Sequence, residues 1–103
     1  MSSLQFGYIP THLGEVIKDE IEYRKISQCK LAQQMGIPYK TLNDLLNGRR
    51  SLTIATAMMF EAALDIPADS LMRLQLKYNM QKAANDHTFI EYLREIRKYA
   101  ALL

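Results

Sequence analysis

The chain has 103 residues, of which 49% are hydrophobic and 23% charged, and its formal net charge is +2. The length allows one core and excludes a large enzyme, and the composition, close to that of average globular domains, excludes a disordered or fibrous chain. Residues 24–50 hold six basic residues against one acidic residue, a concentration typical of a surface that binds a polyanion, although an ordinary solvated face can also show it.

Three helices are predicted before residue 50, from apolar side chains that recur with the 3.6-residue period. The first is capped by Thr11 and ends near residue 24. The second starts after the cap residue Ser27 and ends at Gly36, because glycine enters the left-handed conformation without a steric clash. Pro38 opens the third, which ends near Asn47.

Three more helices are predicted in the second half of the chain. The fourth follows the cap residue Thr53, the fifth spans residues 68–84, and the sixth follows Asp86 and continues to Leu103. The core candidates of the fourth helix are Ile54, Ala57, Met58, Phe60 and Leu64, with Met59 expected beside Met58 as a gap-filling core residue. No segment alternates as a strand would, so the predicted fold class is all-α.

Residues 28–48 match a helix-turn-helix unit, in which two short helices cross steeply over a tight turn. The crossing requires a small residue, which Ala32 provides, and the turn requires a residue that tolerates positive φ, which Gly36 provides. The inward positions are filled by Leu31, Met35, Ile37, Leu42 and Leu45. A plain three-helix bundle with a glycine turn would share these features, but the basic excess over the same residues favours binding to double-stranded DNA.

The second helix of such a unit lies in the major groove with its N-terminal end toward the bases. Its outward side chains are expected to contact base edges: Lys40 at guanine O6 or N7, Asn43 at adenine, and Tyr39 through an apolar contact or a hydrogen bond. Asp44 is repelled by phosphates. It therefore accepts a hydrogen bond from a cytosine amino group or, as we favour, pairs with Lys40.

The other candidate DNA contacts are to the sugar-phosphate backbone. Thr41 is expected at a phosphate, and Gln28 opens a helix whose N–H groups and dipole favour a phosphate oxygen. Arg49 and Arg50 follow the recognition helix, and they either hold the backbone or enter the adjacent minor groove.

Four stretches carry a family resemblance: P-T-H-L-G-E-V-I over residues 10–17, S-Q-C-K-L-A over 27–32, L-L-N-G-R-R over 45–50 and L-Q-L-K-Y-N over 74–79. They are similar to the motifs P-x-H-P-G-E-I/V-L, S-Q-x-x-L-A, L-L-N-G-K/R-R and L-Q-x-x-Y-D of the HigA-type antitoxins. This family of addiction-module antidotes is a branch of the XRE, or lambda-repressor-like, helix-turn-helix proteins. Pro38 departs from the pattern, because the family usually has Ser or Thr at the start of the recognition helix.

The resemblance implies an antitoxin that neutralises a HigB-like mRNA-cleaving toxin protein and represses its own operon as a homodimer. It implies a DNA-binding domain, assigned to residues 1–85, and leaves a C-terminal helix over 86–103 outside the likeness. Two alternatives stay open at this point. One is a stand-alone repressor without a toxin partner, and the other is a protein-interaction module that has lost DNA binding.

The last predicted helix carries an aromatic and aliphatic stripe of Phe89, Tyr92, Ile96 and Tyr99. An exposed stripe would mark a dimer seam or a toxin-docking surface, and the alternative is that it packs back onto the domain's own core.

No catalytic constellation is found, so an enzyme is not expected. One cysteine, Cys29, and two distant histidines do not make a metal-ligand set, and no cofactor is expected either. No apolar run suits a membrane span and no secretory signal is present, so we expect a cytoplasmic protein without a membrane partner.

Overall fold

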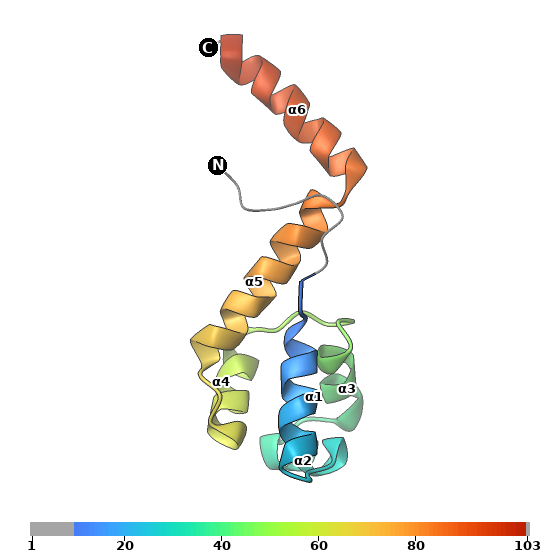
Figure 1. Ribbon diagram of the computed structural model, residues 1–103, viewed down its shortest axis with the longest axis vertical. Helices are drawn as coiled ribbons and strands as arrows, with labels where there is room; N and C mark the ends of the chain where they lie inside the picture. Colours follow the sequence, from blue (N-terminus) through green and yellow to red (C-terminus); the bar gives the residue numbers. More distant parts are fainter. Residues whose placement is uncertain (1–9, 103) are drawn as a thin grey trace. The chain divides into compact units, whose positions relative to one another are not determined.

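The computed structural model describes residues 10–102, and over this range it consists of six helices without a strand (Figure 1). The helices are α1 (Leu13–Tyr23), α2 (Gln28–Met35), α3 (Tyr39–Leu46), α4 (Ile54–Leu64), α5 (Ala68–Ala84) and α6 (His87–Leu102). The all-α prediction is confirmed. The expected end of the last helix at Leu103 and the start of the assigned domain at residues 1–9 lie outside the described residues.

The contacts divide the chain into two units. The first unit is Thr11–Leu76, and the second includes the residues from Lys77 to the end of α6. The first unit holds the core, in which α1 and α2 both pack against α3 (Figure 1). Its buried cluster consists of Leu13, Ile17, Ile21, Leu31, Ala32, Leu42, Leu46, Leu52, Ala57, Phe60, Leu64 and Leu71. Apart from Leu52, which lies between α3 and α4, this cluster is assembled from residues of α1 to α5, and it fixes the position of α3 against its neighbours.

The predicted caps of three helices are confirmed. Ser27 Oγ accepts a hydrogen bond from Lys30 N at 3.1 Å, Thr53 Oγ1 accepts from Thr56 N at 3.2 Å, and Asp86 Oδ1 accepts from Phe89 N at 3.1 Å. Each side chain satisfies one of the N–H groups that have no partner within the first turn of a helix.

The first helix is capped by His12, so the prediction that Thr11 is the cap was wrong. His12 takes the extended N-cap conformation, and its Nδ1 atom accepts a hydrogen bond from Gly14 N at 2.9 Å. Because the helix begins at Leu13, the hydroxyl of Thr11 stands one residue too early to serve as the cap.

We expect His12 to make stability fall with acidification. Burial, together with the charge of Lys18, lowers the pKa of His12, although Glu15 acts in the opposite direction. The unfolded chain therefore takes up a proton below about pH 6.5, while the folded chain resists it until the pH is lower, so stability is lost as the pH falls below about 6.5. Protonation at Nδ1 would also remove the acceptor for Gly14 N.

The measurement for His12 is urea unfolding at pH 7.5 and pH 5.5, with His12→Asn as the control. The asparagine variant keeps a side-chain acceptor for the cap but does not titrate. We therefore expect a smaller loss of unfolding free energy on acidification than in the unaltered chain, and equal losses in the two proteins would contradict the assignment.

The fourth helix corrects one prediction of the core. Ile54 and Met58 are 68% and 58% exposed, and Met59 is 40% exposed, although all three had been assigned to the core. The buried face of α4 is instead formed by Ala57, Phe60 and Leu64. This helix has one charged residue, so its sequence shows no polar face from which the apolar positions on the outside could be distinguished.

The described helices include none that is both long and apolar enough to cross a lipid bilayer.

Candidate nucleic-acid interface

Helices α2 and α3 form the predicted helix-turn-helix unit. Ala32 is buried at the crossing, and its carbonyl oxygen accepts a hydrogen bond from Ile37 N at 3.1 Å across the turn. Gly36 ends α2 with φ at +71°, the left-handed conformation that the turn required. Leu31, Leu42 and Leu45 are buried as expected. The inward faces of both helices are thus used by the core, and the outward face of α3 is left for a partner.

The outward face of α3 exposes the first two residues of the recognition helix. Tyr39 is 49% exposed, and the side chain of Lys40 is 86% exposed. Thr41 is half-buried one residue further on, and Arg49 and Arg50 are exposed after the helix ends. Tyr39 and Lys40 are thus accessible to a ligand at the start of α3, and Arg49 and Arg50 are accessible beyond its end.

Asp44 pairs with Lys40, which was the favoured of its two predicted roles. Lys40 Nζ donates to Asp44 Oδ2 at 3.2 Å, and Arg49 Nε donates to Asp44 Oδ1 at 3.0 Å. The hydrogen bonds from Arg49 and Lys40 hold the pKa of Asp44 below its usual value, so the carboxylate is ionised at neutral pH. The contact with Arg49 was not predicted, because this residue lies beyond the end of the helix, where helical spacing no longer indicates neighbours.

Two other predicted DNA contacts are joined to this pair by hydrogen bonds. Asn43 Nδ2 donates to Gln28 Oε1 at 3.1 Å, which links the start of α2 to α3. Arg49 Nη2 donates to Asn43 Oδ1 at 2.8 Å. We name the five residues Lys40, Asp44, Arg49, Asn43 and Gln28 the recognition-face network.

Three of the predicted DNA contacts lie outside the recognition-face network. Among the described residues, Tyr39, Thr41 and Arg50 are not brought into it by any hydrogen bond or ion pair. Each end of the Asn43 amide makes one hydrogen bond and keeps one further donor or acceptor site, so an adenine contact can be added to these bonds.

One further connection at this face was missed by the sequence reasoning. Lys18 Nζ of α1 donates to Asn47 Oδ1 at 2.8 Å, and Asn47 Nδ2 donates to the carbonyl oxygen of Asn43 at 2.8 Å. The end of the recognition helix is therefore held by α1. The stretch L-L-N-G-R-R indicated the position of Asn47, but nothing in the sequence indicated a partner 29 residues away.

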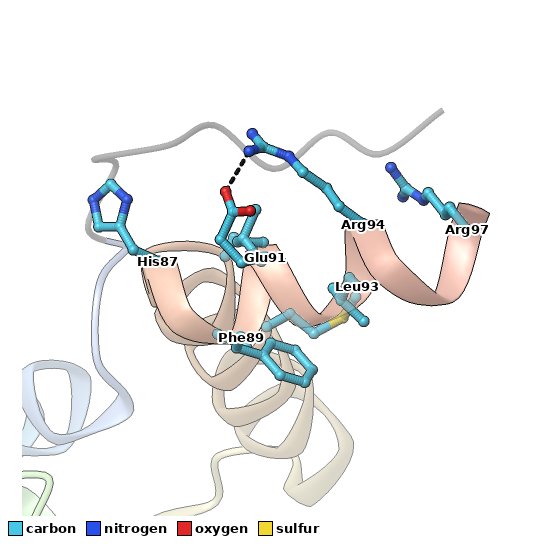
Figure 2. Close-up of a pocket in the computed structure, with 10 residues that line it drawn as sticks. His87, Phe89, Glu91, Leu93, Arg94 and Arg97 are labelled. Atoms are coloured by element: carbon cyan, nitrogen blue, oxygen red, sulfur yellow. Dashed lines mark hydrogen bonds and ion pairs between the residues drawn. The ribbon is translucent and has the colours of Figure 1, made fainter. Parts of the chain in front are cut away.

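The unit that contains α6 carries an open apolar groove of about 740 Å³, within residues 80–97 (Figure 2). Met80, Ala84, Phe89, Ile90 and Leu93 contribute apolar walls, and Arg94, which pairs with Glu91, lies at its border. Among the described residues, no group of His, Cys, Asp and Glu could hold a metal ion.

The predicted stripe of α6 is exposed. Tyr92 and Tyr99 are 62% and 69% exposed, Phe89 and Ile96 are exposed as well, and no described residue of this helix is buried. A row of exposed apolar side chains of this kind is typical of a surface that binds a partner.

Solved structures similar to this chain include DNA-binding proteins and antitoxins. A Pseudomonas aeruginosa protein in complex with its 18-bp operator DNA is 30% identical with a TM-score of 0.71, and the match covers 84% of this chain and 95% of that one. An addiction module antidote protein of a HigA family from Coxiella burnetii is 27% identical with a TM-score of 0.71, covering 88% and 95%. Antitoxin GraA is 25% identical with a TM-score of 0.73, covering 80% and 89%.

The family model described as helix-turn-helix matches residues 17–71, which is more than half of the chain and includes the recognition-face network. No curated protein sequence matches the chain. The matched range begins inside α1 and ends inside α5, so it spans the helices that form the core of the first unit. The chain therefore belongs to the XRE-type helix-turn-helix family, and it resembles the HigA-type antitoxins within that family.

Proposed function

We propose that this protein is the antitoxin of a type II toxin–antitoxin module, which neutralises a HigB-like mRNA-cleaving toxin and represses its own operon as a dimer. The observation that carries the DNA-binding half is the outward face of α3, on which Tyr39, Lys40 and Arg49 are exposed within an XRE-type domain. Such a protein acts by binding and not by catalysis.

The roles of individual residues in DNA binding are part of this proposal. Lys40 has two N–H donors beyond its ion pair, which suits contact with guanine O6 and N7. Arg49 and Arg50 follow α3, where they can hold the backbone. Gln28 lies at the first position of α2, whose N–H groups favour a phosphate.

The toxin-binding and dimer-forming half is supported by two observations. The stripe of α6 is exposed over four large apolar side chains, and two of the similar proteins are described as an antitoxin and an addiction module antidote. We assign residues 1–85 to DNA binding and residues 86–103 to the partner or the second copy. A stand-alone repressor would need the dimer but not the toxin.

The test of the proposal is binding to the promoter upstream of the chain's own gene, measured by fluorescence anisotropy at 100 and 200 mM salt. We expect affinity to fall steeply with salt, because each phosphate contact releases counterions. Co-expression with the adjacent reading frame tests the other half: growth rescue and co-purification support the antitoxin. Operator binding without rescue would indicate the stand-alone repressor, and no salt-dependent binding would indicate an interaction module.

We expect two alanine substitutions to affect DNA binding differently. Lys40→Ala should cost about 1–3 kcal/mol on the operator and little on random DNA, because it removes a base contact. Arg49→Ala should weaken binding to all sequences alike, because it removes a backbone contact. The measurement compares dissociation constants on operator and scrambled duplexes. Equal losses on both duplexes for both variants would contradict the assigned roles.

A further inference from the structure

Asp44 occupies an unusual position for an acidic residue. It is the one acidic residue among residues 24–50, and its side chain, 16% exposed, lies on the recognition helix between Lys40 and Arg49. Both carboxylate oxygens are used, one for each cation, and the backbone carbonyl of Asp44 also accepts from Arg49 N at 2.8 Å. A single residue thus holds one cation at the start of the helix and another after its end.

This arrangement has an electrostatic cost for binding DNA. An ionised carboxylate beside Lys40 and Arg49 cancels part of their attraction for phosphates and repels any phosphate that approaches them. The low pKa of Asp44 means that this charge is not relieved by protonation near neutral pH. A face selected only for tight binding to DNA would therefore do better without it.

The same hydrogen bonds restrict the positions of the Lys40 and Arg49 side chains. The Lys40 ammonium and the Arg49 guanidinium are each held at one carboxylate oxygen, and Arg49 is also held by Asn43. Long basic side chains otherwise sample many rotamers, and fixing them in advance lowers the entropy lost when they meet a base or a phosphate at one defined place. The smaller entropy loss favours a duplex whose bases and phosphates lie where the two cations are held.

We infer that Asp44 is a positioning residue that determines DNA specificity, by weakening binding to unrelated DNA more than binding to the operator. On unrelated DNA, affinity comes from phosphate contacts, from which Asp44 withholds the Lys40 ammonium. On the operator, the positioned Lys40 side chain recovers this loss through its base contact. The inference rests on the DNA-binding function proposed above.

The experiment uses Asp44→Asn in the full-length chain. The specific probe is a duplex that the unaltered chain selects from a randomised pool, and the non-specific probe is a scrambled duplex of the same length and composition. We expect binding to the scrambled duplex to tighten by about 3- to 10-fold and to change less on the selected duplex, so the specificity ratio falls. The slope of log affinity against log salt on the scrambled duplex should steepen by about 1, because one more phosphate contact forms.

The matched control is Asp69→Asn. Asp69 forms an i,i+4 ion pair with Arg73 at 3.4 Å on the exposed surface of α5, so this change removes the same charge from the same kind of pair away from α3. Asp69→Asn should leave the ratio and the slope as in the unaltered chain. Asp44→Glu retains the charge and should leave binding to the scrambled duplex unchanged, so it tests the inference even if Asp44→Asn fails to fold.

The outcomes separate this inference from the proposed function. If the unaltered chain binds both probes and the ratio is the same in Asp44→Asn as in Asp69→Asn, the inference is wrong and the function stands. Tighter binding of Asp44→Glu to the scrambled duplex also overturns it, because repulsion by the charge would then not be the cause. If the unaltered chain selects no duplex from the pool and does not bind the scrambled duplex, the proposed function fails and the inference fails with it.

Discussion

Gly14→Ala is expected to destabilise the fold by about 3 kcal/mol or more, because α1 and the end of α3 meet at this glycine. A Cβ atom at residue 14 would lie 1.9 Å from the carbonyl oxygen of Leu46 and 2.6 Å from its carbonyl carbon. Both atoms belong to the backbone, so no side-chain rotation can relieve the clash, and the two helices would have to separate. The loss would be a large fraction of the stability of a domain of this size.

The measurement is thermal unfolding followed by circular dichroism, with Asp19→Ala as the control. Asp19 lies on the same helix and is exposed, so replacing it by alanine should change the midpoint little. For Gly14→Ala we expect the midpoint to fall by about 12 °C or more, if the chain folds at all. A midpoint within 2 °C of the unaltered chain would show that α1 and α3 do not approach as closely as described.

The effect should extend to DNA binding. Leu46 is the last residue of α3, and Asn47, which follows it, is held by Lys18 of α1. Moving α1 away from α3 would therefore disturb the end of the recognition helix and the turn that places Arg49 beside Asp44. Binding by any folded fraction of Gly14→Ala should be weaker on the operator and on unrelated DNA.

Local sequence signals predicted most of the helical framework, because helix starts and ends depend on residues near one another. The range 68–84 of α5 was predicted as found, and Ser27, Thr53 and Gly36 perform the expected cap and turn functions. These signals act through hydrogen bonds or φ angles within one turn of the chain, so a single sequence contains them.

The contacts that complete the candidate interface could not be predicted in the same way. The closeness of Gly14 to Leu46 and the bond from Lys18 to Asn47 depend on how two helices pack, which no local pattern records. The opening motif of the antitoxin family includes the glycine at position 14, but the motif does not indicate which contact requires a glycine there. The pairing of Asp44 with Lys40 could be predicted from the sequence, because an i,i+4 spacing brings side chains together on a helix.

The second large effect is expected from substitutions in the exposed stripe of α6, and it concerns assembly. A repressor that reads two half-sites needs two recognition helices, and linking two binding domains raises affinity far above that of one. The stripe offers a surface for a second copy: Tyr92 and Ile96 are exposed one helical turn apart, and no described residue of α6 is buried within its own chain. Tyrosines on such surfaces commonly contribute most of the binding energy.

We expect the double variant Tyr92→Ala and Ile96→Ala to be monomeric and to bind the operator about 100-fold more weakly, while its core remains folded. The control is Glu91→Ala with Lys98→Ala, two exposed residues of the same helix outside the stripe that carry opposite charges, so the net charge is again unchanged. The measurements are molar mass by light scattering and operator affinity on the same samples.

If the mass and the affinity both stay unchanged but co-purification of the toxin is lost, the stripe meets the toxin and not a second copy. Because the core of the first unit lies in Thr11–Leu76, neither variant should alter cooperative thermal unfolding of that core, which keeps a loss of assembly distinct from a loss of folding.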